Sequence, residues 1–219
     1  MHRKNLFRRT RLERFVGWMQ GRGPWLWFIV GSVAVLAISH FVFQRWFLMP
    51  PCEECVYIRF AFFALAVGAL IPLLTPRFFV MRLLGYIAGF AASAYGIFHA
   101  LTLMAIHSAL RSSDPTALFG VKMCSLTPAF PFELPFDAYL PALFKPEGPC
   151  GADVPVVPPE TVLGDWQASV IAQIQDAGGW YLFPWWQTGS MAECALVIFA
   201  LVFLWLLSAV LLEGFAKRF

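Results

Sequence analysis

Charged residues are scarce in this sequence: they make up 13% of its 219 residues, against about 25% in a typical soluble domain. Hydrophobic residues make up 59%, well above the roughly 45–50% of soluble domains. This shortage of charge argues against a soluble globular protein. The net charge of +3 calls for no nucleic-acid partner, because the basic residues gather in the segments outside the long apolar runs.

Long apolar runs account for the excess of hydrophobic residues. Four runs each reach the ~20 residues needed to cross a hydrocarbon core about 30 Å thick, and they are residues 25–47, 56–74, 83–107 and 191–212. Backbone polar groups in lipid must be satisfied within the segment, so each run is expected to be a helix. The first run is too long for the core of a signal peptide and lacks a small-residue cleavage site, so we expect it to be retained. The sequence therefore predicts an all-α integral membrane protein, a four-transmembrane-helix bundle in a lipid bilayer.

Basic residues are unevenly distributed among the segments outside these runs. Most of the basic residues lie in three segments, 1–24, 75–82 and 213–219. The loop 48–55 has no Lys or Arg, and the loop 108–190 has three basic residues against eight acidic ones. Because basic flanks stay on the cytoplasmic side, we expect a basic N-terminal arm, a short loop and a tail in the cytoplasm. One short and one long loop then face the opposite side, which is the periplasm for a protein of the bacterial inner membrane.

The long loop has two different halves. Residues 126–150 are rich in proline and aromatic residues, which favours irregular extended structure over a packed subdomain. Residues 160–176 place Val162, Trp166, Val170 and Ile174 at spacings of four, which predicts an amphipathic helix. This helix could lie in the membrane interface, with nearby tryptophans in the aromatic belt, or pack on the top of the bundle.

Four of the five cysteines fall in the two outward-facing loops. Cys52 and Cys55 form a C-x-x-C motif in the short loop, and Cys124 and Cys150 lie in the long one. Two pairs of cysteines suit an oxidising compartment such as a bacterial periplasm. Cys194 lies within the last apolar run and is interpreted as a small buried hydrophobic residue.

The C-x-x-C motif has three ordinary interpretations: a static disulfide, part of a zinc site, or a redox-active dithiol. Val56 stands where a haem-attachment motif needs histidine, so that function is excluded. The separation between Cys124 and Cys150 is unusual for a four-thiolate zinc site. The redox interpretation is favoured because Cys55 falls at the start of a helix, where backbone N–H groups favour an anion, and Arg59 follows one turn later.

A dithiol that is oxidised repeatedly needs an acceptor for two electrons. At a membrane surface the available carrier is a lipid-soluble quinone. Residues at a suitable depth to bind its ring are Gln44, Arg59, His107 and Met191. Each also has an ordinary alternative: Gln44 and His107 as interfacial polar residues, Met191 as lipid-facing packing, and Arg59 as a side chain extending to the interface.

Several motifs together resemble the DsbB family of quinone-dependent thiol oxidoreductases, and its DsbI branch in particular. They are QGRG at 20–23, FQ at 43–44, PCEECVYIRF at 51–60, and the pair KMC…GPC that ends at Cys124 and Cys150. The similarity covers the four-span core, and the extra residues 151–190 before the last span point to the DsbI branch.

The resemblance implies a mechanism. Cys124 and Cys150 would form a disulfide offered to a periplasmic thioredoxin-fold oxidase of the DsbA or DsbL type. Cys150 would then engage Cys52, and Cys55 would pass electrons to ubiquinone or menaquinone beside Arg59. A mobile proline-rich arm could carry Cys150 toward Cys52.

The family also has a histidine near the quinone at the end of the third span. Depth favours His107 for this role, and His99 is then expected to be hydrogen-bonded inside the bundle. Two alternatives to the enzyme stay open: a metal-binding membrane protein that uses the four outer cysteines, and an assembly protein with static disulfides.

Overall fold

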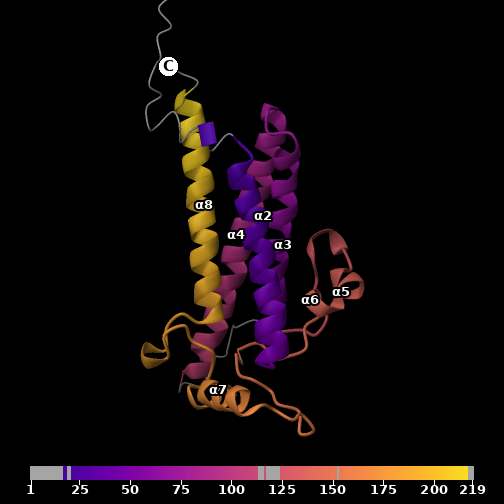
Figure 1. The fold of residues 1–219 in the computed structure, drawn as a ribbon, viewed down its shortest axis with the longest axis vertical. Coiled ribbons are helices and arrows are strands. Elements are labelled where there is room, and N and C mark those ends of the chain that lie inside the picture. Colours follow the sequence, from indigo (N-terminus) through magenta and orange to yellow (C-terminus); the bar gives the residue numbers. More distant parts are fainter. Residues whose placement is uncertain (1–16, 19–20, 113–115, 117–123, 152, 217–219) are drawn as a thin grey trace, which may run out of the picture.

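The computed structural model describes residues 17–18, 21–112, 116, 124–151 and 153–216. Most of the predicted basic arm, the end of the tail, and part of the QGRG and KMC motifs lie outside these residues. The described chain folds into an upright bundle of four long helices, with the connecting loops that carry the cysteines gathered at one end (Figure 1). The start of the first helix and the end of the last lie at the opposite end of the bundle (Figure 1).

The four long helices confirm the predicted fold class. They are α2 with its continuation η1 (Gly23–Ala37 and Ile38–Trp46), α3 (Glu53–Leu74), α4 (Phe79–Arg111) and α8 (Met191–Ala216). Each is long and apolar enough to cross a membrane. Within the described ranges the chain forms no β-strand, and the pairing of Phe183 with Thr188 is an isolated bridge.

Helix α3 is the most buried of the four because it packs against α2, α4 and the short helix α6 (Pro141–Phe144), whereas α4 packs against α3 and α8. Small residues allow these close contacts. A Cβ atom on Gly68 of α3 would lie 2.7 Å from the Cβ of Ala88 on α4. Phe62 of α3 stacks on Phe199 of α8 with ring centroids 4.3 Å apart, which closes the core of the bundle.

The first spanning helix changes its winding before it ends. It begins as an α-helix with Pro24 in its first turn, where a missing N–H is tolerated. From Ile38 to Trp46 it is a π-helix, and the Phe47 N–H donates to the Val42 carbonyl. Such wide turns are rare and are frequent at functional sites. Leu48, with φ of 55°, then turns the chain toward α3.

The proline-rich half of the long loop is more ordered than predicted. It forms three short helical turns, η3 (Pro131–Glu133), α5 (Phe136–Tyr139) and α6 (Pro141–Phe144), beside α3 (Figure 1). Phe130 and Phe144 are buried against Val56 and Tyr57 of α3. The expectation of irregular structure without packing was wrong, because the aromatic residues between the prolines form a small core of their own.

The second half of the long loop contains α7 (Asp165–Asp176), which begins later than predicted. Ile171 and Ile174 form its buried side, whereas Trp166 is 72% exposed. Val162 is 95% exposed and precedes the helix. The predicted apolar face was therefore wrong in its first two members.

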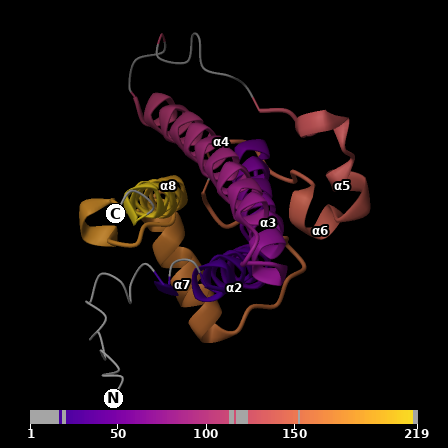
Figure 2. The same cartoon turned by 90° about the horizontal axis from the view of Figure 1, so that it is seen from above.

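Contacts with the first span hold α7 across the end of the bundle (Figure 2). The Gln167 side chain donates to the Trp46 carbonyl at 2.6 Å, and the Trp46 and Trp166 rings lie 4.8 Å apart. Of the two predicted positions, these contacts favour packing on the bundle.

Candidate functional site

The C-x-x-C motif forms the first turn of α3. Pro50 and Pro51 precede it, and Cys52 is the N-cap residue, with an extended backbone (φ −83°, ψ 170°). Its Sγ accepts a hydrogen bond from the Cys55 backbone N–H at 3.2 Å. Cys52 thereby satisfies one of the N–H groups that every helix start leaves without a partner.

The two thiols of the motif have different surroundings. Both are free, but Cys52 is 3% exposed whereas Cys55 is only partly buried. The side-chain hydrogen bond to Cys55, together with burial, raises the pKa of the Cys52 thiol well above its ordinary value. Cys52 therefore holds its proton strongly, and Cys55 is the more accessible of the two sulfurs.

Cys124 and Cys150 are joined by a disulfide, with Cα atoms 5.7 Å apart. This is the pairing that the family resemblance implies. Cys150 packs against the same buried cluster that contains Cys52, and Cys55 packs there too. The two pairs of cysteines therefore lie next to each other, one oxidised and one reduced.

Hydrogen bonds fasten the segment before Cys150 to the short loop. The N–H groups of Glu147 and Gly148 both donate to the Pro51 carbonyl, at 2.9 and 3.1 Å. A Cβ atom on Gly148 would lie 2.9 Å from the Pro50 ring and 3.1 Å from its carbonyl oxygen, so only glycine fits here without a shift. The arm that was expected to be mobile is docked in this state.

A second set of hydrogen bonds fastens the segment after Cys124 to α3. The Ser125 N–H donates to the Glu53 carboxylate at 2.6 Å. The Tyr57 hydroxyl donates to the same carboxylate at 2.8 Å and accepts from the Ala129 N–H, also at 2.8 Å. Glu53 and Tyr57 are each 3% exposed, so this polar cluster is held in a fixed, buried geometry.

Arg59 lies one turn after Cys55 and is 6% exposed. Its guanidinium donates to the Ser39 hydroxyl at 2.7 Å, the Ser39 carbonyl at 3.2 Å, the Gln44 side-chain oxygen at 3.0 Å and the Leu143 carbonyl at 3.2 Å. It therefore joins the π-helical segment to α3 and α6, and it does not extend to the surface. Electrostatic interactions link its charge to Cys55 and Cys52.

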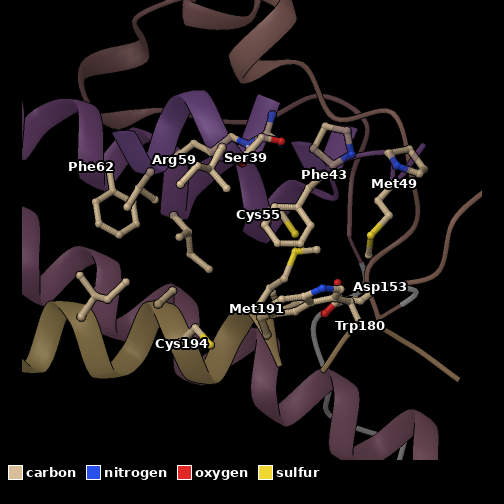
Figure 3. Close-up of a pocket in the computed structure, with 18 residues that line it drawn as sticks. Ser39, Phe43, Met49, Cys55, Arg59, Phe62, Asp153, Trp180, Met191 and Cys194 are labelled. Carbon is tan, nitrogen blue, oxygen red and sulfur yellow. Dashed lines mark hydrogen bonds between the residues drawn. The ribbon is translucent and has the colours of Figure 1, made fainter. Parts of the chain in front are cut away.

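A cavity of about 230 Å³ opens between the spans beside Cys55 (Figure 3). Its walls are mostly apolar side chains from α2, α3, α4 and α8, together with the two outer loops. The polar groups on its surface are few, and they include Cys55, Arg59 and Asp153. An apolar cavity with a few convergent polar groups is the usual form of a small-molecule site.

The predicted quinone-binding residues divide into two groups. Arg59 and Met191 line the cavity, together with the catalytic candidate Cys55. Gln44 is not among its lining residues and instead contacts Arg59, so it supports that side chain from behind. His107 lines a smaller adjoining space of about 30 Å³ and lies 3.7 Å from Asp153, which lines both.

His99 has a partner inside the bundle, as expected for a structural histidine. Its Nδ1 lies 2.5 Å from a carboxylate oxygen of Glu54, which is fully buried between the two cysteines of the motif. The rings of Tyr57 and Tyr95 pack against it with centroids 4.6 and 4.3 Å away.

Several cavity residues were missed by sequence reasoning. Asp153 and Trp180 come from the extra segment before α8, and Phe43 comes from the π-helical segment. Nothing in their spacing marks them, because they meet only through the path of the loop. Cys194 is half-buried and lines the cavity, with its thiol 3.4 Å from the Gly189 carbonyl. The interpretation of Cys194 as a simple packed residue was therefore wrong.

The cavity fits the ring of a quinone. An apolar cavity of about 150 Å³ is enough to hold benzene, so about 230 Å³ accommodates a substituted six-membered ring. Asp153 Oδ2 is buried there without a hydrogen-bond partner, which leaves a polar atom available to a bound carbonyl or hydroxyl. The Arg59 guanidinium supplies positive charge on the same wall.

No cluster of three or more His, Cys, Asp or Glu side chains suited to a metal ion occurs in the part of the chain that the structure describes. Two of the four outer cysteines are joined to each other. Four thiolates are thus not brought together in this state.

Comparison with known proteins identifies the family. The model of the family "Disulfide bond formation protein DsbB" matches residues 21–209. A protein-disulfide oxidoreductase DsbI of Salmonella typhimurium is 38% identical over 207 residues, 93% of this chain and 92% of its own. A protein of the same name from Escherichia coli is 37% identical over 194 residues, 89% and 87% of the two chains. Another from Lelliottia amnigena is 43% identical over 150 residues, 68% of each. The chain therefore belongs to the DsbB family of membrane protein-disulfide oxidoreductases.

Proposed function

We propose that this protein is a thiol:quinone oxidoreductase of the bacterial inner membrane. It reoxidises a periplasmic thioredoxin-fold disulfide donor of the DsbA or DsbL type and passes two electrons to ubiquinone or menaquinone. The observation that carries the proposal is the position of Cys55. It lies at the start of α3, next to a disulfide on one side and to a cavity with Arg59 on the other.

The topology follows from the charge pattern. The loop 48–55 lacks basic residues and the arm before α2 is rich in them, so the cysteine-bearing end faces the periplasm and both termini face the cytoplasm. A soluble partner can then reach Cys124, which is half-buried at that end.

Thiol–disulfide exchange links the cysteines in sequence. The cycle starts with Cys52 and Cys55 joined in a disulfide. A thiolate of the partner attacks Cys124 and releases the Cys150 thiolate. Cys150 attacks Cys52 and breaks its bond to Cys55, so that Cys55 leaves as a thiolate. The partner's second thiolate then displaces Cys124, which attacks Cys150 and releases Cys52. The oxidised partner leaves, and Cys52 and Cys55 carry the two electrons. The partner's thiols lose two protons in these steps, and Cys52 takes up one of them. A quinone bound in the cavity is the acceptor of these electrons, and the Cys52–Cys55 disulfide forms as they leave.

The protein side chains prepare the site for this exchange. Arg59 holds positive charge beside Cys55, and a thiolate is the form that reacts in thiol–disulfide exchange. Its four hydrogen bonds fix the guanidinium in place, so the charge is already oriented when electrons move. Cys52 keeps its proton until its sulfur is needed for the disulfide.

The test is a quinone-reduction assay on the detergent-purified protein, with a reduced thioredoxin-fold partner and a soluble quinone analogue. The native protein should consume quinone absorbance. Cys55→Ser should not, while it still forms a mixed disulfide with the partner through Cys124. Turnover by Cys55→Ser would remove Cys55 from its proposed role, and no turnover by the native protein with any such partner would refute the function.

Arg59→Lys separates this function from that of a static disulfide protein. Lysine keeps the charge but cannot make the same set of hydrogen bonds. Loss of a hydrogen bond to a charged group is worth about 1.5–3 kcal/mol, so KM for quinone should rise by roughly tenfold or more. A protein with static disulfides would be indifferent to this change, and an unchanged KM would support that alternative.

A further inference from the structure

The extra segment after Cys150 builds one wall of the cavity. It contributes Asp153 and Trp180, whose backbones are joined by a hydrogen bond from the Trp180 N–H to the Asp153 carbonyl at 3.0 Å. The Trp180 ring meets Phe43 edge-on, with centroids 4.9 Å apart. Figure 3 shows Trp180 and Asp153 on the same side of the cavity as Met191. The segment is therefore part of the site and not only a surface loop.

Asp153 and His107 form an incomplete pair at the boundary of the cavity. The Asp153 side chain is 12% exposed and that of His107 is 7% exposed. Asp153 Oδ2 and His107 Nε2 are 3.7 Å apart, and each lacks a hydrogen-bond partner. Buried polar atoms are nearly always hydrogen-bonded, so two facing atoms without partners call for an explanation.

Burial favours the protonated form of Asp153. Burial raises the pKa of the Asp153 carboxyl, and the positive charges of His107 and Arg111 on α4 oppose this shift only in part. Two other titratable groups lie nearby: the Cys52 thiol, which interacts with Asp153, and Glu193 at the start of α8, which interacts with His107. A carboxylic acid that keeps its proton beside an apolar cavity can act as a donor.

A route for protons continues outward from this pair. The smaller space of about 30 Å³ is lined by His107, Arg111, Asp153 and Tyr181, and one water needs only about 10–15 Å³. Arg111, which is exposed, donates to the Tyr181 hydroxyl at 3.2 Å, and this places the smaller space next to the surface.

We propose that Asp153 is the proton donor of the quinone cavity and that His107 returns its proton from the smaller, outward space. This assignment rests on the proposed function and deepens it. Quinone reduction takes up two electrons and two protons, and disulfide formation by Cys52 and Cys55 releases the same number of each. The Asp153 carboxyl gives one proton to a quinone oxygen, and the Cys52 thiol gives the other to the reduced quinone as its sulfur bonds to Cys55. The second proton that the partner's thiols released re-enters through His107 Nε2 and restores Asp153.

Asp153→Asn keeps the size of the side chain and removes its proton. General acid catalysis contributes about 10²–10⁴-fold, so quinone reduction at saturating quinone should slow by at least tenfold. The native rate should fall as pH rises through the pKa of Asp153, and this fall should be absent from the variant. Asp153→Glu should recover part of the rate and the pH dependence. Asp176→Asn, an exposed acid on α7 of the same loop, should behave like the native protein.

Two further measurements exclude a merely structural role. Without quinone, transfer of electrons from the reduced partner to Cys52 and Cys55 should proceed equally in the native protein and Asp153→Asn. Infrared spectra of the quinone-free native protein should contain the band of a buried protonated carboxyl, which should disappear in Asp153→Asn and remain in Asp176→Asn.

The possible results are distinct. A native rate and pH profile in Asp153→Asn, or an infrared band that does not depend on Asp153, would overturn the assignment while leaving the oxidoreductase intact. A higher KM with an unchanged rate at saturating quinone would also overturn it, because Asp153 would then only bind. Absence of quinone reduction by the native protein would instead be a failure of the proposed function, and the assignment would fall with it.

Discussion

The hydrogen bonds of Tyr57 suggest a sharp test of how the disulfide-bearing loop is held. Tyr57→Phe removes a single hydroxyl, which donates to Glu53 and accepts from the Ala129 N–H, both at 2.8 Å. A bond to a carboxylate is worth about 1.5–3 kcal/mol, and an amide left without its acceptor costs about 1–3 kcal/mol. The Ser125 bond to Glu53 survives the substitution, so we take the lower part of this range. The loop should be held less tightly by roughly 2 kcal/mol, which is a change of about 30-fold in its opening equilibrium.

Hydrogen exchange followed by mass spectrometry measures this opening directly. The peptide that contains Ser125 and Ala129 should exchange about 30-fold faster in Tyr57→Phe than in the native protein. Tyr95→Phe is the matched control. Its ring lies 6.3 Å from that of Tyr57 and packs on the same histidine, but its hydroxyl has no hydrogen bond to the loop among the described contacts.

Two results would refute this reasoning. If the Ala129 amide exchanged at the native rate in Tyr57→Phe, the hydroxyl would not hold the loop. If Tyr95→Phe accelerated exchange equally, the effect would come from packing of the aromatic rings and not from the hydrogen bonds.

Two other predictions concern the cysteines and their flanks. Gly148→Ala places a Cβ atom 2.9 Å from the Pro50 ring, so it should lower the free energy of unfolding by about 1–3 kcal/mol and slow the exchange between the two cysteine pairs. Gly164→Ala is the control, because nothing lies within 4 Å of its added atom. Equal shifts of the melting temperature for the two variants in detergent would contradict the prediction. The raised pKa of Cys52 keeps its thiol protonated to higher pH, so alkylation of Cys52, followed by mass spectrometry, should begin at higher pH in the folded protein than in the unfolded chain. Identical pH midpoints would show that the hydrogen bond and burial do not stabilise the thiol form.

Much of the fold could be predicted from the sequence because lipid imposes a simple rule. A long apolar run with few charges has to be a helix, and the four runs are all helical in the structure. The disulfide between Cys124 and Cys150 also agrees with the resemblance. Cys55 and Arg59, four residues apart on one helix, do line the same cavity.

The loop could not be predicted in the same way, because its contacts depend on its path and not on a period. Asp153 and Trp180 are 27 positions apart in the chain and meet through a backbone hydrogen bond. The face of α7 was misassigned because the helix begins only after Gly164, so Val162 does not share its period. The proline-rich segment packs because Phe130 and Phe144 supply a core that the prolines alone do not suggest.

The π-helical segment from Ile38 to Trp46 has a consequence for how this site can change. Ser39 and Phe43 line the cavity from this segment, and Gln44 reaches Arg59 from it. Loss of any one residue here would leave the span almost as long and as apolar as before. It would nevertheless turn every later side chain of the segment relative to the earlier ones, by somewhat less than the roughly 100° per residue of an α-helix because π-helical turns are wider. The site is thus encoded partly in the number of residues in the first span, and a single deletion could disable it without altering any residue that touches a sulfur.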